Sequence, residues 1–270
     1  QLWTLGFVKL NFTGGEALIR RDAADVIAHA RDLGFRDLHL NTNGLLLDRR
    51  RLAEVIRAGI RSFNISVDGS SAERHDGIRG RSGSFESATE ALRLVVEQRE
   101  RYGLDVRLNF TVLANNAGDL PEIAALARDL GVALYLNLGT DQTFLFRHEQ
   151  VTGLLDVDEA QLRRSLTELE SMVRQDPNGL PSLAALRYIP GHFGLAETRY
   201  VPCAESQLKL MVRSTGAVGG CWGHDATMNV RNQSIRSIID SSHYRDEHQR
   251  FFEKDCVSCG SNYALNIRVA

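Results

Sequence analysis

The stretch FTGGEAL, residues 12–18, joins an apolar run to a helical pattern. The run before it, FVKLNF at residues 7–12, has the composition of a β-strand. A strand-to-helix turn can be made with one glycine, yet Gly14 and Gly15 stand in succession and the carboxylate of Glu16 follows them. Glycines at such a turn allow unusual backbone conformations and close approach. The stretch therefore predicts that a ligand comes close to the backbone here.

Working outward from this turn, strand patterns alternate with helical patterns. The strand patterns lie at residues 7–12, 36–44, 61–69, 105–116 and 132–140, and the helical patterns between them lie at residues 22–33, 48–58, 84–102 and 119–130. Repeated β-α units predict an α/β fold with a parallel sheet and crossover helices. A further amphipathic helix is expected over residues 158–175. In such sheets, ligands bind at the carboxyl ends of the strands.

Polar residues gather where each predicted strand ends. They are Thr13 to Glu16, Asn41 to Gly44, Ser66 to Gly69, Asn109 to Thr111 and Asn137 to Thr140. Turn-forming residues commonly follow strands, which explains any one group by itself. Five such groups at the carboxyl edge of one sheet, which we call the rim, predict a ligand site. Tyr135, Asn109 and Asn137 are candidates for lining its cavity, but the sequence does not fix which face of a strand each side chain takes.

The bulk composition restricts the classes of partner. The chain has 270 residues, 43% of them hydrophobic, and a formal net charge of −2. That is enough material for a sizeable core, and the near-neutral charge gives no reason to expect nucleic acid or a membrane as a partner. No run of 18 apolar residues and no signal peptide is visible. We expect a cytoplasmic protein.

Four motifs together carry a family resemblance. FTGGEAL is followed by LNTNG at residues 40–44, NISVDGSSAERHDGIRG at residues 64–80 and GSFESATEAL at residues 83–92. In this combination the chain resembles a radical S-adenosylmethionine (SAM) enzyme. Ala17 departs from the family pattern, which usually has proline after the glutamate. The resemblance covers about half of the chain, from residue 5 to residue 140.

The resemblance implies a SAM site at the rim. In this family the Gly-Gly-Glu turn, here Gly14, Gly15 and Glu16, binds the amino group of the methionine moiety. Further contacts with SAM or substrate are implied for Thr42, Asn43, Ser66, Asp68 and Arg79. Arg79 is the candidate for the SAM carboxylate, because a guanidinium can bind a carboxylate with two hydrogen bonds. A surface ion pair between Arg79 and Asp76 is the alternative.

One defining feature of the family is missing from this sequence. The family carries a C-x3-C-x2-C loop whose thiolates hold the 4Fe–4S cluster that binds SAM, and its TIM-like barrel usually has six β-α units. Here five units are visible, so the resemblance implies a partial (β/α)6 barrel without its first unit. We expect the missing unit and the cluster ligands upstream of Gln1. The alternative is a degenerate protein that has lost this cluster.

All four cysteines stand near the C-terminus, at Cys203, Cys221, Cys256 and Cys259. Their spacing, C-x12-G-x4-C followed by C-x2-C, resembles the twitch form of the SPASM domain, although the further cysteines of a full SPASM domain are absent. The resemblance implies an auxiliary 4Fe–4S cluster held by these four thiolates. Structural zinc and two disulfides, Cys203–Cys221 and Cys256–Cys259, are the alternatives. The glycines before Cys221 suit a β-hairpin.

The implied organisation is a barrel with a connector over residues 1–200 and a cluster subdomain over residues 201–270. The implied activity uses a 5′-deoxyadenosyl radical to abstract hydrogen from a C–H bond, with electrons from a donor such as flavodoxin or ferredoxin. The four-cysteine arrangement is similar to that of an alcohol dehydrogenase of this superfamily, and this resemblance implies oxidation of a small-molecule alcohol on a cyclitol or sugar. Modification of a ribosomally made peptide is the alternative. A non-catalytic barrel with a zinc clasp is a third reading, and no catalytic residue is assigned.

Overall fold

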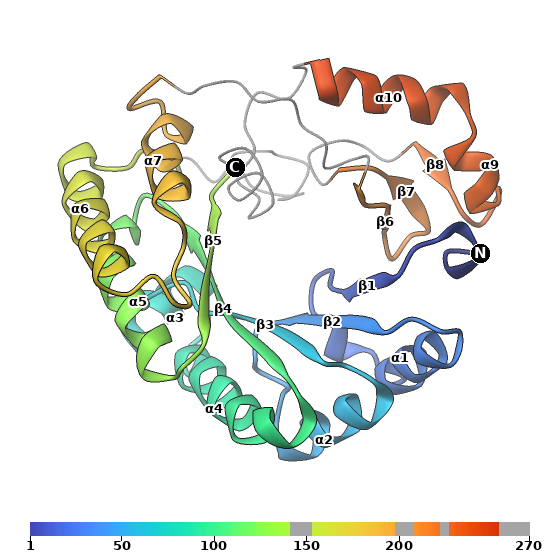
Figure 1. The fold of residues 1–270 in the computed structure, drawn as a ribbon, viewed down its shortest axis with the longest axis horizontal. Coiled ribbons are helices and arrows are strands. Elements are labelled where there is room, and N and C mark those ends of the chain that lie inside the picture. The colour runs from blue at the N-terminus through green and yellow to red at the C-terminus, as the bar shows by residue number, and fades with distance from the viewer. Residues whose placement is uncertain (141–152, 198–207, 222–226, 254–270) are drawn as a thin grey trace.

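The computed structural model describes residues 1–140, 153–197, 208–221 and 227–253 (Figure 1). Its centre is a parallel five-stranded sheet whose strands follow one another in chain order. The strands are β1 (Lys9–Phe12), β2 (Asp37–Thr42), β3 (Ser62–Ser66), β4 (Asp105–Val112) and β5 (Ala133–Leu138). The predicted α/β fold with a parallel sheet is confirmed. The assignment of this sheet to a six-unit barrel without its first unit stays a prediction.

Helices cover the convex face of the curved sheet (Figure 1). They are α1 (Ala23–Asp32), α2 (Arg49–Ala58), α3 (Ala72–Arg79), α4 (Ser84–Tyr102) and α5 (Leu120–Asp129). Four of them match predicted helices. The exception is α3, which begins at the N-cap Ser71 and ends at Gly80, where φ is 63°. It is short and buries only His75 among its residues, so it lacks the apolar spacing that predicts a helix.

The two faces of the sheet differ in polarity, and β4 shows this most clearly. Val106, Leu108, Phe110 and Val112 are buried in the core beneath the helices. The alternate residues Arg107, Asn109 and Thr111 are half-buried on the other face. Because side chains of a strand alternate between faces, this pattern fixes the orientation that the sequence left open. The helix-free concave face is polar.

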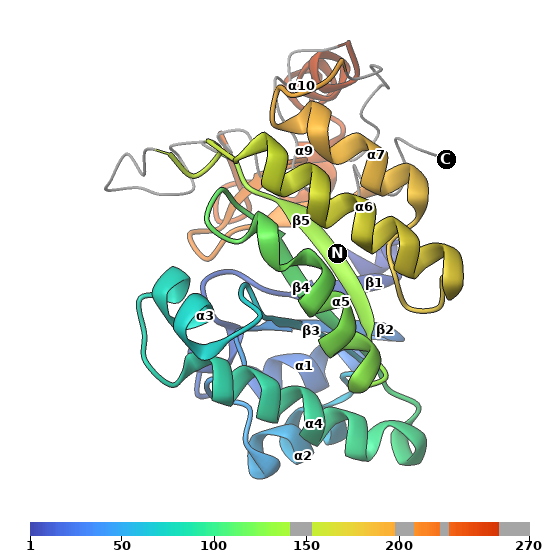
Figure 2. The ribbon, with the colours of Figure 1, turned by 90° about the vertical axis from the view of Figure 1, so that its left-hand side faces the viewer.

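Two helices follow the sheet. The predicted helix is confirmed as α6 (Glu159–Gln175), which packs beside α5 and faces the viewer in Figure 2. The next helix, α7 (Leu183–His192), packs against α6 and contains Pro190. The His192 side chain reaches back to the barrel, with its Nε2 atom 2.8 Å from the carbonyl oxygen of Gly139. These helices extend the helical layer past β5.

A small antiparallel sheet lies near the C-terminal end of the described chain. It comprises β6 (Met211–Val212), β7 (Ala217–Gly219) and β8 (Met228–Asn229), followed by α9 (Ile235–Ile239) and α10 (Ser242–Glu253). The predicted hairpin before Cys221 is present. A separate apolar cluster holds this part together: Val218, Met228, Ile238 and Tyr244. The predicted domain boundary at residue 200 lies outside the described residues. Among the described helices, none has the length and apolar character needed to cross a membrane.

Gly44 lies where the turn after β2 packs closely against α4, and a substitution can test this packing. Its φ is 82°, and an added Cβ would lie 2.8 Å from the Cα atom of Ala88. Gly103 has a similar φ of 61°, but an added Cβ there would meet nothing within 4 Å. We expect Gly44→Ala to lower the free energy of unfolding by about 2–4 kcal/mol, from backbone strain plus overpacking. Gly103→Ala should lower it by only about 1–2 kcal/mol. Urea denaturation followed by circular dichroism measures both, and equal losses would contradict the close packing at Gly44.

Candidate functional site

The carboxylate of Glu16 connects the turn after β1 to the turn after β2. Its Oε1 atom accepts a hydrogen bond from the Leu18 N–H at 3.1 Å, and its Oε2 atom accepts one from the Asn43 N–H at 2.8 Å. The Thr42 hydroxyl donates to the same carboxylate at 3.0 Å. A carboxylate has about four acceptor positions, and three donors occupy most of them. Glu16 therefore fixes the two turns relative to one another.

The two glycines of this turn face open space. Gly14 has a φ of 129°, which L side chains rarely adopt, and a Cβ added to Gly14 or Gly15 would meet no atom within 4 Å. Packing against the protein therefore does not require glycine at either position. The open space on this side of the backbone fits the approach of a ligand such as SAM, whose ammonium group can be met by backbone carbonyl oxygens. The role of both residues in SAM binding stays a prediction.

The turn after β2 is held by its own side chains. The Asn43 Oδ1 atom accepts from the Leu45 N–H at 3.0 Å, and the Thr42 hydroxyl oxygen accepts from the Gly44 N–H at 3.1 Å. Side-chain bonds to backbone two residues ahead are typical of Asn and Thr in turns. Asn43 therefore shapes the turn that Glu16 holds. The structure does not test whether its amide also contacts SAM.

Asp68 is buried at the end of β3, with 4% of its surface exposed. Its Oδ1 atom accepts a hydrogen bond from the Thr111 N–H of β4 at 2.8 Å, and its Oδ2 atom lies 2.5 Å from Nη2 of Arg79. Arg79 thus pairs with Asp68, and the alternative pair with Asp76 is wrong. The Arg79 side chain is 33% exposed. Both predicted residues form one ion pair at the rim.

Asp76 instead anchors the start of α4. Its carboxylate accepts from the Gly83 N–H at 2.6 Å, from the Ser84 hydroxyl at 2.8 Å and from the Phe85 N–H at 2.9 Å. A carboxylate at a helix N-terminus satisfies N–H groups that have no partner within the helix. Asp76 therefore ties α3, the helix that ends at Arg79, to the start of α4.

Two buried residues that the sequence analysis did not identify stabilise the end of β3. His75 accepts a hydrogen bond from the Asp68 N–H at its Nδ1 atom, over 2.9 Å, and burial lowers the pKa of His75. Asn116 donates to the carbonyl oxygens of Asp68 and Thr111 at 2.9 and 2.8 Å. A histidine in a short helix and an asparagine in a loop are common, so the sequence alone does not indicate that His75 and Asn116 contact the end of β3.

A row of polar side chains crosses the concave face of the sheet. Asn64 donates to Asn41 at 2.8 Å on neighbouring strands β3 and β2, and Asn137 donates to Asn109 at 2.7 Å on β5 and β4. Tyr135 lies on the same face, where the Arg107 guanidinium stands 4.8 Å from its ring centre. The three predicted cavity residues Asn109, Tyr135 and Asn137 therefore share the polar face. Ser66 pairs in register with Asn109 at the end of β3 and is half-buried.

Only one of the four predicted metal ligands lies within the described residues. Cys221 follows β7 and is half-buried. Cys203, Cys256 and Cys259 lie outside the described residues. The auxiliary cluster, the zinc alternative and the two disulfides therefore all stay predictions.

Comparisons with known sequences identify the same region. The profile of the Radical SAM superfamily matches residues 1–127. An AdoMet-dependent heme synthase of Oleidesulfovibrio alaskensis is 34% identical over 124 residues, which cover 46% of this chain and 31% of the relative. A PqqA peptide cyclase of Gluconobacter oxydans is 34% identical over 134 residues, which cover 48% of this chain and 35% of the relative. The matched regions thus span about a third of these relatives.

The solved structure of Streptococcus suis SuiB bound to its precursor peptide SuiA has a similar fold. The TM-score is 0.68 at 14% sequence identity, and the match covers 96% of this chain and 60% of SuiB. At that identity the likeness concerns the fold, including the part of the chain that follows β5. The profile match and the sequence identity to these relatives lead to one conclusion: residues 1–127, which carry the Gly-Gly-Glu turn at the rim of the parallel sheet, match the radical SAM superfamily.

Proposed function

We propose that this chain is the SAM-binding barrel portion and auxiliary-cluster portion of a radical SAM enzyme that modifies a ribosomally made peptide. The observation that carries the SAM-binding part is the turn at Gly14 and Gly15, which is open on one side and braced on the other by Glu16. It combines backbone carbonyl oxygens, a carboxylate and free space at the carboxyl edge of a parallel sheet, where ligands of such sheets bind.

The rim residues have distinct roles in this proposal. Gly14, Gly15 and Glu16 receive the SAM ammonium group, and the guanidinium of the partly exposed Arg79 receives the SAM carboxylate. Asp68 acts through Arg79, because the ion pair of 2.5 Å orients the guanidinium. Ser66 and Asn43 lie at the neighbouring strand ends and contact the ribose or methionine end of SAM.

Bound SAM and its 4Fe–4S cluster would supply the radical that removes a hydrogen atom from the substrate. The protein positions the reactants and excludes water. The polar concave face, with its two asparagine pairs and Tyr135, would position the substrate beneath the rim. The four cysteines would hold the auxiliary 4Fe–4S cluster, and a flavodoxin or ferredoxin would donate electrons.

A peptide substrate has better support than the alcohol substrate expected from the cysteine spacing. A relative at 34% identity is named a PqqA peptide cyclase, and SuiB was solved with a precursor peptide. The relatives reported above include no alcohol-oxidising enzyme by name. The proposed substrate is therefore a ribosomally made peptide, and oxidation of a cyclitol or sugar alcohol becomes the competing outcome of the test.

SAM binding tests the rim. We expect Glu16→Gln to weaken SAM binding by about 1.5–3 kcal/mol, the usual size for a hydrogen bond to a charged group. The NH2 group of the glutamine amide would also face N–H and O–H groups that now donate hydrogen bonds to the Glu16 carboxylate, and it cannot accept them. Titration calorimetry of SAM into the cluster-loaded protein measures the effect. The exposed Glu90→Gln removes the same charge from α4 and should leave the affinity unchanged. Unchanged affinity in Glu16→Gln would overturn the proposed role.

The substrate class is tested by turnover without oxygen. The cluster-loaded protein is mixed with SAM, a reductant and either a short peptide encoded beside its gene or a panel of sugar alcohols. Formation of 5′-deoxyadenosine is measured by chromatography, and the mass of the peptide is measured by mass spectrometry. We expect 5′-deoxyadenosine and a mass change with the peptide. Turnover with a sugar alcohol and none with the peptide would overturn the peptide proposal.

A further inference from the structure

A buried histidine lies directly against the end of β3. His75 is 1% exposed and is the buried residue of α3. The helix α3 packs against α4, where the Phe85 ring meets the His75 ring edge to face, with the ring centres 5.9 Å apart (Figure 2). A Cβ added to Gly69 would lie 2.4 Å from the backbone nitrogen of His75, so the loop after β3 also packs closely against α3. His75 therefore lies where β3, α3 and α4 meet.

The hydrogen bond that His75 accepts defines the protonation state of its ring. The Asp68 N–H donates to the Nδ1 atom of His75 over 2.9 Å. Nδ1 can accept this bond only while it carries no proton, so the ring is neutral and its proton is on Nε2. A proton on Nδ1 would place two N–H donors opposite one another and would leave the Asp68 N–H without an acceptor. The contact therefore exists only in the neutral form of His75.

The backbone of Asp68 determines where the proposed carboxylate-binding group of the rim lies. His75 holds its N–H group, and Asn116 donates to its carbonyl oxygen at 2.9 Å. The Asp68 side chain accepts from the Thr111 N–H at 2.8 Å and pairs with Arg79 at 2.5 Å. A shift of the Asp68 backbone would therefore move its carboxylate, and with it the Arg79 guanidinium.

The charged groups around His75 come from three elements. Burial lowers the pKa of His75, and the neighbouring Arg79 lowers it further. Three carboxylates act in the opposite direction: Asp68 at the end of β3, Asp76 on α3 and Glu86 on α4. Arg74, which precedes His75 in the helix, pairs with Asp119 at 3.2 Å. The net direction is downward, so the ring is neutral at pH 7 and takes up a proton only below the ordinary histidine value of about 6.5.

We propose that His75 is a positioning residue for SAM binding, which holds Asp68, and through it Arg79, only while its ring is neutral. This inference rests on the proposed SAM site at the rim. It adds a regulatory property to that site: the affinity for SAM falls in mild acid, because protonation of His75 releases the Asp68 N–H.

Two substitutions separate the acceptor from its titration. His75→Asn keeps an acceptor, since the Oδ1 atom of asparagine takes a place close to that of Nδ1, but it does not titrate. His75→Leu removes the acceptor and keeps an apolar side chain. Titration calorimetry of SAM into the cluster-loaded protein, from pH 8 to pH 5.5, compares both variants with the unsubstituted protein.

We expect the affinity of the unsubstituted protein to fall as the His75 ring becomes protonated, by up to about tenfold per pH unit, the limit for one proton. His75→Asn should bind as tightly at pH 7 and lose less affinity in acid. His75→Leu should bind about tenfold more weakly at pH 7, because the buried Asp68 N–H is left without an acceptor.

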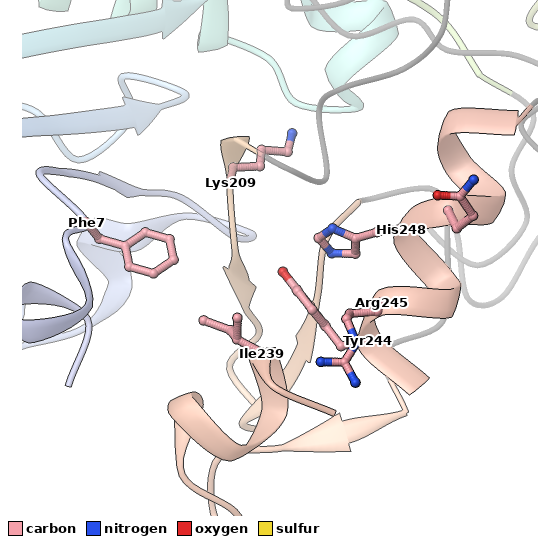
Figure 3. A pocket seen from close by; sticks show the side chains of 7 residues that line it. Phe7, Lys209, Ile239, Tyr244, Arg245 and His248 are labelled. Atoms are coloured by element: carbon pink, nitrogen blue, oxygen red, sulfur yellow. The ribbon is translucent and has the colours of Figure 1, made fainter. Parts of the chain in front are cut away.

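His248 provides the matched control. Burial lowers its pKa too, but it lines a cavity of about 480 Å³ beside Phe7 and Tyr244, whose described lining contains no residue of the rim (Figure 3). His248→Asn therefore removes a second histidine with a lowered pKa at a different place in the fold. It should leave both the SAM affinity and its pH dependence unchanged.

Hydrogen exchange of the Asp68 amide, followed by NMR without SAM, gives a second readout. At pH 7 the amide should be protected in the unsubstituted protein and in His75→Asn, and should exchange faster in His75→Leu. Equal protection in all three would overturn the inference. So would equal SAM affinity of His75→Leu and the unsubstituted protein, or an affinity that stays constant while NMR shows the His75 ring becoming protonated. Absence of SAM binding in every form would instead contradict the proposed function itself.

Discussion

Replacing any one of Cys203, Cys221, Cys256 or Cys259 with alanine is expected to remove most of the iron that the chain binds. Four thiolates ligate one 4Fe–4S cluster completely, so removing one leaves an iron of this cluster without its protein ligand and weakens retention of the cluster. The unsubstituted 270-residue chain, purified without oxygen, should contain about four irons and four sulfides, because it carries the ligands of the auxiliary cluster alone. Each variant should also lose stability of the C-terminal region, because metal binding there contributes to folding free energy. Iron and sulfide analysis with visible absorption measures the loss.

His224 provides the matched control. It stands three positions after Cys221 in the sequence, yet four cysteines already complete the cluster. His224→Ala should therefore keep its iron. One zinc per chain, with four sulfur ligands at about 2.3 Å by X-ray absorption, would make the region a structural clasp. Four oxidised cysteines in protein that never held metal would favour the two disulfides. Either result would exclude the auxiliary cluster.

The second large effect is expected at Asp68. Asp68→Ala leaves the Thr111 N–H without its acceptor and the Arg79 guanidinium without its carboxylate. We expect the free energy of unfolding to fall by about 2–4 kcal/mol, below the full value for a buried pair because Arg79 is partly exposed. Asp22→Ala is the matched control, since Asp22 pairs with Arg20 at the surface over 2.7 Å. Because water screens that exposed pair, the change should leave the free energy of unfolding nearly unchanged.

Urea denaturation of both variants, with the wild type in parallel, gives the comparison. Similar losses at Asp68 and Asp22 would mean that burial of Asp68 adds nothing to the ion pair. A loss at Asp68 with unchanged SAM affinity would contradict its proposed role in orienting Arg79.

The sheet and most of its helices were predictable because their signals are local. Apolar runs bounded by Gly34, Gly59, Gly103 and Gly131 mark the β-α units without knowledge of any distant contact. The helix α3 escaped prediction because it buries little and is held by its cap at Ser71. The order of strands also follows from sequence, since sequential strands usually pair.

The contacts of the rim were less predictable because they join distant parts of the chain. The sequence places Arg79 next to Asp76, whereas the fold brings it to Asp68 and gives Asp76 to the start of α4. The contact of Asn116 was equally unpredictable, because its side-chain amide donates to the carbonyl oxygen of Asp68, 48 positions earlier in the chain. The face of the sheet on which Asn109 and Asn137 lie could be determined only from the burial of the residues next to them in each strand. The sequence showed that the rim is polar, but it did not show which of its side chains pair with one another.

The three donors on Glu16 have a consequence for the thermodynamics of SAM binding. Because Leu18, Thr42 and Asn43 already hold the carboxylate, the two turns are ordered in the folded chain itself. Ordering a residue's backbone costs about 1–2 kcal/mol, and for these turns that cost falls on folding and not on association. Binding at the rim should then proceed with little conformational entropy loss from the protein, as in a rigid, preorganised receptor. Its heat capacity change should reflect desolvation of the ligand surface without a contribution from coupled folding.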